Sequence, residues 1–189
     1  MTELSSDFDE FKLPWPITII DFEASSLEEG SYPIEVGVGI WNAPRDPILL
    51  WSTLIRPAWN WSLNGHWSRR SEGVHGIPQA ELANGKDPSE VARILNDRVS
   101  ARVAWCDGGP YDAYWLRTLY AAAGCAPSFS LMDLGALFIG RPGLSERLDA
   151  FLERTPAPHR AGKDVLRLLR ALASAIGMDV SVLPLRDGQ

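Results

Sequence analysis

The hydrophobic residues in the first third of the chain fall in short runs that predict three strands. Residues 16–24 (PITIIDFEA) are rich in isoleucine, and their apolar positions fall on both faces, which is typical of a central strand. Residues 34–41 (IEVGVGIW) and 48–55 (ILLWSTLI) predict a second and a third strand. A turn signal separates these two runs, and such short spacings favour an antiparallel meander.

Helical spacing of apolar residues dominates the rest of the chain. One helix is expected to begin after Asp87, because Asp is a preferred cap, Pro88 suits the first turn and Glu90 the third helical position. The apolar spacing predicts three further helices, over residues 111–123, 144–152 and 160–176. Two short strands, the second of which also fits a turn, are expected over residues 102–106 and 129–134. Three strands followed by alternating helices and strands predict an α/β fold with a mixed sheet flanked by helices.

The length and composition are those of one ordinary globular domain. The chain has 189 residues, of which 46% are hydrophobic and 22% charged, and it contains neither an internal repeat nor a low-complexity linker. We therefore expect residues 1–189 to form a single domain, with its core at about residues 16–176 and short extensions at both ends. No segment approaches the roughly 20 apolar residues of a membrane span. The N-terminal sequence lacks the pattern of a signal peptide, and two cysteines make no disulfide framework, so a cytoplasmic protein without a membrane partner is expected.

The net charge limits the kind of nucleic-acid binding that this chain can perform. The formal charge is −6 and the pI is about 5.1. Taken alone, this charge argues against tight nonspecific binding to a phosphate backbone. Acidic residues that are gathered to hold cations also lower the formal charge, however, and the bound cations reverse the local field. A metal-dependent protein that acts on nucleic acid therefore remains compatible with the composition.

Four acidic residues are expected on the inward side of their elements. Asp21 and Glu23 stand two positions apart near the end of the first expected strand, so their carboxylates point to one face. Asp112 shares a face with the apolar residues of its helix, and Asp164 lies at the edge of the apolar stripe of the last helix. Each acid alone also fits a cap or a surface charge. Four inward-facing acids together are hard to explain as caps, because burying unpaired charge is costly.

Carboxylates that converge in this way need a source of positive charge. At an effective dielectric constant of about 20, two carboxylates ~4 Å apart repel each other by ~4 kcal/mol. Hard divalent cations with oxygen ligands relieve this repulsion, and Mg²⁺ or Mn²⁺ suits carboxylates and water. Two such ions can stabilise the attacking and leaving oxygens of a phosphodiester displacement. His159, expected at the start of the last helix, fits either a general base for the attacking water or a simple cap or surface group.

These residues resemble the motifs of the DEDDh family of 3′–5′ exonucleases, which includes polymerase proofreading subunits, oligoribonuclease and ribonuclease T. The resemblance rests on an ordered set of motifs: Asp21-Phe22-Glu23, Tyr111-Asp112, and the HxAxxD spacing of His159 to Asp164. Residues 74–77 (VHGI) and 131–134 (LMDL) are similar to two shorter family segments. The match runs from about residue 16 to residue 176. A lone DxE pair is weak evidence, whereas the ordered set with a complete HxAxxD is specific.

The resemblance implies a ribonuclease H-like fold and a two-metal exonuclease that releases nucleoside 5′-monophosphates from the 3′ end of single-stranded DNA or RNA. It implies two Mg²⁺ or Mn²⁺ ions held by Asp21, Glu23, Asp112 and Asp164, and His159 as the general base. It also implies contacts with the terminal nucleotide from Phe22, Ala24 and Leu27. Several relatives are homodimers, so a homodimer is a possible assembly. Two other functions compete: a nucleic-acid-binding protein that has lost turnover, and a phosphodiesterase acting on small nucleotides.

The chain departs from the family pattern near the second motif. Family members often carry Asn four residues before the second-motif Asp, where this chain has Gly108, preceded by Asp107. The usual Thr-Thr-Gly-Leu-like run is Ala24-Ser25-Ser26-Leu27. Neither change removes an expected metal ligand or the base, so the departures bear on substrate preference rather than on chemistry.

Several other residues have two interpretations at this point. Leu27 fits a substrate contact or a loop anchor in the core, and Glu35 fits an approach to the metals or a satisfied structural acid. His75 fits a structural role or the wall of the substrate cleft. The loop expected around Trp59, Trp61 and Trp67, followed by Arg69 and Arg70, fits either base stacking or packing. Cys106 is expected in the core, and solvated faces are expected for Arg141, Arg167 and Arg170.

Overall fold

The computed structural model describes residues 11–186, and the first ten residues of the expected N-terminal extension lie outside the described part. Its centre is a six-stranded mixed sheet with the strand order β5-β4-β1-β2-β3-β6. The strands are β1 (Ile17–Ala24), β2 (Pro33–Trp41), β3 (Ile48–Leu54), β4 (Val103–Cys106), β5 (Ser130–Asp133) and β6 (Val182–Pro184). The helices are α2 (Trp59–Asn64), α3 (Arg69–His75), α4 (Pro88–Arg98), α5 (Pro110–Ala123), α6 (Pro142–Leu152) and α7 (Ala161–Ala175), with 3₁₀ helices η1 (Gln79–Asn84) and η2 (Leu134–Phe138).

The sheet combines the expected antiparallel meander with parallel strands. β1 and β2 pair antiparallel, as do β2 and β3, whereas β4 runs parallel to β1 and β5 runs parallel to β4. β1 is a central strand, as its apolar residues on both faces predicted. Its register places Asp21 opposite Gly37 and Glu23 opposite Glu35 on β2.

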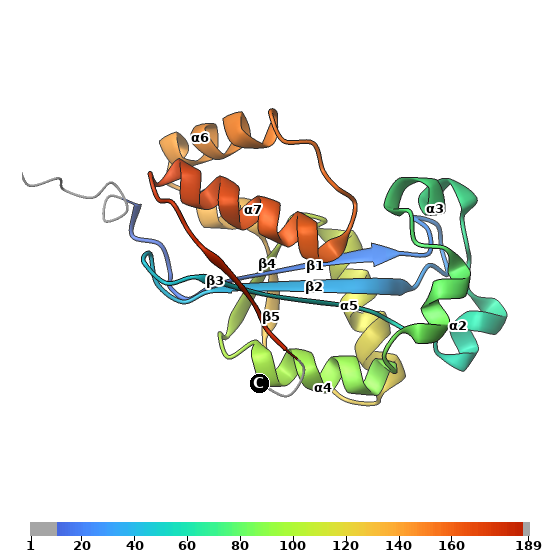
Figure 1. Cartoon of the computed structure of the whole chain (residues 1–189). Helices are drawn as coiled ribbons and strands as arrows, with labels where there is room; N and C mark the ends of the chain where they lie inside the picture. Colours follow the sequence, from blue (N-terminus) through green and yellow to red (C-terminus); the bar gives the residue numbers. More distant parts are fainter. Residues whose placement is uncertain (1–10, 187–189) are drawn as a thin grey trace, which may run out of the picture.

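Helices cover both faces of the sheet and create one apolar core on each side (Figure 1). α7 packs on β1, β2 and β3, and α6 packs on α7, whereas α4 and α5 lie on the opposite face. The alternation of β1 serves both cores: Ile17 and Ile19 face α7, and Ile20 and Phe22 face the other side. Asp21 and Glu23 follow the odd-numbered residues and therefore point to the side of α7.

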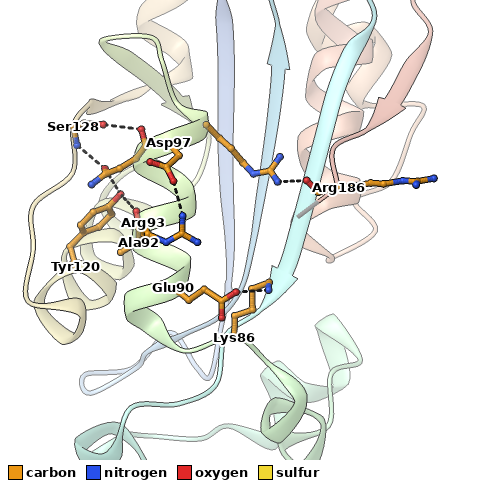
Figure 2. Close-up of polar contacts among 10 residues, drawn as sticks. Lys86, Glu90, Ala92, Arg93, Asp97, Tyr120, Ser128 and Arg186 are labelled. Carbon is orange, nitrogen blue, oxygen red and sulfur yellow. Dashed lines mark hydrogen bonds and ion pairs between the residues drawn. The ribbon is translucent and has the colours of Figure 1, made fainter. Parts of the chain in front are cut away.

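Polar contacts fix α4 against α5, the helix that carries Asp112 (Figure 2). The Tyr120 hydroxyl donates to the Ala92 carbonyl at 3.2 Å and lies 2.8 Å from the side-chain oxygen of Asn96, which also accepts from the Ser128 N–H. The ion pair of Arg93 with Asp97 on α4 is exposed and adds only ~0.3–0.5 kcal/mol. The expected helix start at Asp87 is confirmed, because its carboxylate accepts from the Ser89 N–H.

Two glycines of β2 allow α7 to lie directly on the sheet. A Cβ atom at Gly37 would stand 2.4 Å from the carbonyl carbon of Ala161, and one at Gly39 would stand 2.4 Å from Cδ1 of Leu169. Real Cβ atoms do not tolerate such distances, so any other residue would push the helix outward. Because Gly37 is the partner of Asp21 in the sheet, this close approach brings the N-terminus of α7 over the carboxylates of β1.

The structure corrects three expectations from the sequence. The tryptophan segment is not a loop throughout: Trp59 and Trp61 begin the short helix α2, and Trp61 is buried in a stack on Tyr32 with ring centroids 5.7 Å apart. Arg141 does not lie on a solvated face, because it donates to three backbone carbonyls, including that of Leu137. Arg167 is half-buried and donates to the backbone carbonyls of Leu152, the last residue of α6, and of Thr155, which follows that helix. Among the described residues, no helix is long and apolar enough to cross a membrane.

Candidate active site

Three of the expected acids meet where β1 passes under the start of α7. Asp21 and Glu23 point from β1 toward α7, and Asp164 lies in the first turn of that helix. One carboxylate oxygen from each of the three residues lies within 4.8 Å of the other two. All three side chains are half-buried, so the group is shielded from bulk water but can be reached from outside.

A second group of carboxylates shares Asp21 with the first. Asp21, Asp107 and Asp112 also offer oxygens that lie within 4.8 Å of one another. Asp112 is 1% exposed at the start of α5, and it accepts a 3.0 Å hydrogen bond from the Gly108 N–H. A Cβ atom at Gly108 would stand 2.6 Å from a carboxylate oxygen of Asp112. The departure from the family pattern at Gly108 therefore has a packing reason: a larger residue there would displace Asp112.

Asp107 is a member of this constellation that the sequence analysis did not select. It directly follows β4, which runs parallel to β1 and lies next to it in the sheet. Because adjacent parallel strands end at the same edge of a sheet, an acid just after β4 is brought close to the acids near the end of β1. The signal was present in the sequence, but using it required the pairing of the expected strand 102–106 with the first strand.

The electrostatics show that this cluster lacks positive charge. Burial raises the pKa of Asp21 well above its usual value, and the negative charges of Asp112 and Glu23 raise it further. Burial, followed by the charges of Asp164 and Glu35, raises the pKa of Glu23 to about 8. Burial also raises the pKa of Asp112 to about 7. Near neutral pH, the cluster therefore has to bind protons or cations.

Glu35 holds the start of α7 in place. Of the two roles that its sequence position allowed, it therefore has the structural one. Its buried carboxylate accepts two hydrogen bonds from the Arg160 guanidinium, at 3.1 and 2.8 Å, and one from the Ala161 N–H at 2.9 Å. The backbone N–H of Arg160 in turn donates to the Asp164 carboxylate at 2.8 Å. A bidentate pair of this kind is geometrically specific. It connects β2 to the segment that carries both His159 and Asp164.

His159 lies in the loop before α7, at the edge of a cavity. Its side chain is exposed and its backbone is in the left-handed region, with φ of 52°, which is uncommon for a residue other than glycine. The cavity has a volume of about 480 Å³, and His159 and Glu23 both line it. The three expected substrate contacts line it as well: Phe22, Ala24 and Leu27. Leu27 is 62% exposed and is therefore not a core anchor.

The far wall of the cavity consists of residues that the sequence analysis did not assign to a substrate site. It is formed mainly by α3 and its start, through Ser68, Arg70, Ser71, Val74 and His75, and by Trp115 of α5. The three tryptophans considered for base stacking do not line this cavity. Cys106 is buried as expected, and burial raises the pKa of its thiol to about 12, so it carries no thiolate near neutral pH.

Comparison with known proteins yields likeness at the level of structure. Neither a family model nor a curated protein sequence matches the chain. Among solved structures, Escherichia coli ExoI bound to single-stranded DNA with zinc matches 85% of this chain with a TM-score of 0.66 at 12% identity, and this chain spans 40% of ExoI. A 3′-exonuclease that recognises the 3′ end of the histone mRNA stem-loop matches with a TM-score of 0.63 at 16% identity, over 85% of this chain and 81% of that one.

A full-length 3′-exonuclease matches over 93% of both chains, with a TM-score of 0.64 at 15% identity. Sequence identities this low establish a common architecture and leave the activity to be argued from the site. The mixed sheet with its flanking helices agrees with these structures. The chain therefore has the ribonuclease H-like α/β fold found in these 3′-exonucleases.

Proposed function

We propose that this protein is a metal-dependent 3′–5′ exonuclease that hydrolyses the terminal phosphodiester bond of single-stranded DNA or RNA and releases nucleoside 5′-monophosphates. The observation that carries the proposal is the presence of two clusters of three acidic residues that share Asp21. They lie beside a cavity that is large enough for a nucleotide. Two of the solved structures with this fold are described with single-stranded DNA or with an RNA stem-loop, which supports a nucleic-acid substrate.

The donor set fits two hard divalent cations. Every candidate ligand atom is a carboxylate oxygen, which is the donor type that Mg²⁺ and Mn²⁺ prefer. Asp21 would contribute to both sites, Glu23 and Asp164 to one of them, and Asp112 to the other. When bound, such ions neutralise phosphate charge and lower the pKa of water. The raised pKa values of these acids support the assignment, because a cluster that gains from protonation also gains from cations.

In this proposal, the chain itself supplies a base and a nucleotide pocket. His159 accepts the proton of the attacking water, and its exposed position beside Glu23 at the cavity gives it access to a substrate phosphate. Phe22, Ala24 and Leu27 contact the terminal nucleotide. Arg160 has its guanidinium bound to Glu35, so it positions the loop of His159 rather than the substrate. A cytoplasmic location and a homodimer remain predictions that accompany this function.

An end-labelled cleavage time course tests the proposal. Short single-stranded DNA and RNA carrying a 5′ label are incubated with the protein in Mn²⁺ or in EDTA, beside the Asp21→Asn variant. We expect a ladder that shortens from the 3′ end in Mn²⁺, no cleavage in EDTA, and no cleavage by the variant. If folded protein that binds Mn²⁺ cuts neither strand, the exonuclease proposal is wrong; the same preparation is then assayed on small nucleotide phosphodiesters.

A further inference from the structure

His75 is a buried histidine in the wall of the nucleotide cavity, and the proposed hydrolysis does not use it. It is the last residue of α3 and is only 5% exposed, and it is one of the residues that line the cavity. Its Nδ1 atom lies 3.0 Å from the backbone nitrogen of Ile77. Because a backbone N–H can only donate, Nδ1 must be the acceptor. The neutral ring therefore carries its hydrogen on Nε2.

This Nε2–H group has no hydrogen-bond partner among the described residues. The Nε2 atom is fully buried. The neighbouring Trp67 ring stands edge-on at 6.2 Å, and its own N–H donates to Glu72. Buried polar groups in folded proteins are normally paired, so an unpaired donor in a cavity wall indicates a partner that comes from outside the chain.

The surroundings of His75 favour the neutral form of its ring. Burial lowers the pKa of the ring, and the nearby negative charges of Glu72 and Glu35, which act in the opposite direction, are partly balanced by Arg160 and His159. The bond from Ile77 selects the tautomer, so the donor has one fixed orientation. The same cavity has apolar walls from Phe22, Val74 and Trp115, beside polar side chains such as Ser68 and Ser71.

We propose that Nε2–H of His75 donates a hydrogen bond to an acceptor atom on the sugar or the base of the 3′-terminal nucleotide. This inference rests on the proposed exonuclease function, because it assigns a specificity role within the same cavity. Discrimination follows from the chemistry: a site built to hydrogen-bond one ligand atom rejects an analogue that lacks it, since the buried donor is then left unpaired. His75 acts in substrate binding and takes no part in proton transfer to the reacting atoms.

Two substitutions separate the donor at Nε2 from the structural acceptor at Nδ1. His75→Asn retains an oxygen near the Nδ1 position that can accept from the Ile77 N–H, but it has no group at Nε2. His75→Gln places an amide N–H near the Nε2 position and loses the acceptor for Ile77. A purely structural histidine would be replaced better by Asn, whereas a donor to the ligand is replaced better by Gln.

The measurements are the Kd for 5′-labelled five-nucleotide DNA and RNA in Ca²⁺, by fluorescence anisotropy, and KM and kcat in Mn²⁺. For His75→Asn we expect Kd and KM to rise about tenfold, roughly the 1.4 kcal/mol equivalent of one hydrogen bond, with kcat and Tm near those of the wild type. For His75→Gln we expect a lower Tm and a Kd within about threefold of the wild type. These opposite patterns are the signature of the proposal.

Modified 3′-terminal nucleotides identify the acceptor. If a sugar hydroxyl accepts, a terminal 2′-deoxy or 3′-deoxy nucleotide that lacks this hydroxyl will bind the wild type more weakly than the ribonucleotide, and His75→Asn will remove that difference. If the base accepts, an abasic terminal nucleotide will weaken binding to both proteins, and the loss will be about tenfold larger for the wild type than for His75→Asn. Either result supports the proposal.

Two results would overturn it, and they are distinguishable from each other. An unchanged Kd and KM in folded His75→Asn, or an equal loss of affinity in the Asn and Gln variants, would remove the donor role and leave the exonuclease intact. Failure of the wild type to bind or cleave any of these strands would instead remove the proposed function, and the role of His75 with it.

Discussion

At the scale of single residues, Asp21 matters most for the proposed metal site, because it belongs to both clusters of three acidic residues. Two carboxylates ~4 Å apart repel by ~4 kcal/mol at an effective dielectric constant of about 20, and burial adds to the cost of their ionisation. Asp21→Asn keeps the shape of the side chain and removes one charge. We expect this variant to melt at a higher temperature than the wild type in EDTA, to lose most of its stabilisation by Mn²⁺, and to cleave no nucleic acid.

Asp97→Asn is the matched control for this charge removal. Asp97 is an exposed acid that pairs with Arg93 at 2.9 Å on α4, and α4 lies on the face of the sheet opposite α7 (Figure 1). An exposed pair of this kind contributes ~0.3–0.5 kcal/mol, so Tm, metal response and cleavage should stay near those of the wild type. If Asp21→Asn responded to Mn²⁺ as the wild type does, Asp21 would not be a metal ligand.

His159 permits a second prediction at this scale, because its side chain is exposed and supports no core contact. His159→Ala should lower kcat by about 10²–10⁴-fold, the range for loss of a general base, while Tm and the Mn²⁺ response stay unchanged. Steady-state kinetics and thermal melts measure the two effects. Added imidazole should restore part of the rate, because the cavity edge is open to small molecules. Wild-type turnover in the variant would show that another group accepts the proton.

Single residues also show how far the sequence could locate the site. The spacing of Asp21 and Glu23 on a strand gave their common direction, and helical periodicity gave the inward position of Asp112. Asp107 could not be predicted as part of the site, because its position depends on the pairing of β4 with β1, and hydrophobic periodicity does not reveal which strands pair. The role of Glu35 depends on a contact across 125 positions of the sequence, with Arg160, and only the folded chain reveals it.

At the scale of elements, the position of α7 on β2 decides whether Asp164 reaches the carboxylates of β1. Gly37→Ala would place a methyl group 2.4 Å from the carbonyl carbon of Ala161. Backbone atoms cannot rotate away, so the helix start must move, at a cost of about 1–3 kcal/mol or more. We expect a lower Tm and a Kd for Mn²⁺ that is weakened by at least about tenfold, measured by calorimetry.

Gly73→Ala provides the control for this substitution. Gly73 lies inside α3, and a Cβ atom there would meet nothing within 4 Å. Alanine at an exposed helical position is favoured over glycine by up to about 1 kcal/mol, so this variant should be as stable as the wild type or slightly more stable. Mn²⁺ affinity that is equal in wild type and Gly37→Ala would show that the close approach of α7 does not shape the metal site.

The elements that the sequence predicted share a strong internal pattern. The strands β1 to β3 are apolar runs, and the helices α4, α5, α6 and α7 have eleven to fifteen residues with a clear apolar stripe. The missed helices α2 and α3 have six and seven residues, too few for periodicity to register. They are held by tertiary contacts such as the stack of Trp61 on Tyr32. This weakly patterned part of the chain forms the far wall of the cavity, which is why the substrate side of the site was hard to predict.

At the scale of the whole molecule, the clustered acidic residues lower the stability of the metal-free fold near neutral pH. The net charge of −6 is concentrated in part at one place, where β1, β4, α5 and α7 bring five carboxylates together. The apolar cores on the two faces of the sheet hold these elements in position. The stability of the metal-free protein should therefore depend on pH through this cluster, in a direction that bound cations oppose.

The sign of that dependence follows from the raised pKa values. Burial raises the pKa of Glu23 from 4.5 to about 8 and that of Asp112 from 3.8 to about 7, so protons bind the folded state more tightly than the unfolded one. The stability that these two groups contribute is fully present below about pH 4 and is lost as the pH rises through about 7 and 8. Cations compete with the same protons, so metal affinity should rise over that interval.

Thermal melts at several pH values, with and without Mg²⁺, test this coupling. Between about pH 5.5 and pH 8.5, the increase in Tm caused by a fixed Mg²⁺ concentration should grow, because a lower Kd yields more stabilisation through RT ln(1 + [L]/Kd). At each pH, the Tm without Mg²⁺ is subtracted from the Tm with Mg²⁺. This subtraction removes the effect on Tm of groups that titrate elsewhere in the chain. In Asp21→Asn, the increase in Tm caused by Mg²⁺ should vary less with pH, since this substitution removes the carboxylate that both clusters of acidic residues share. A Mg²⁺ effect of equal size at both pH values would mean that the ions do not displace protons from Glu23 and Asp112, and that they bind elsewhere.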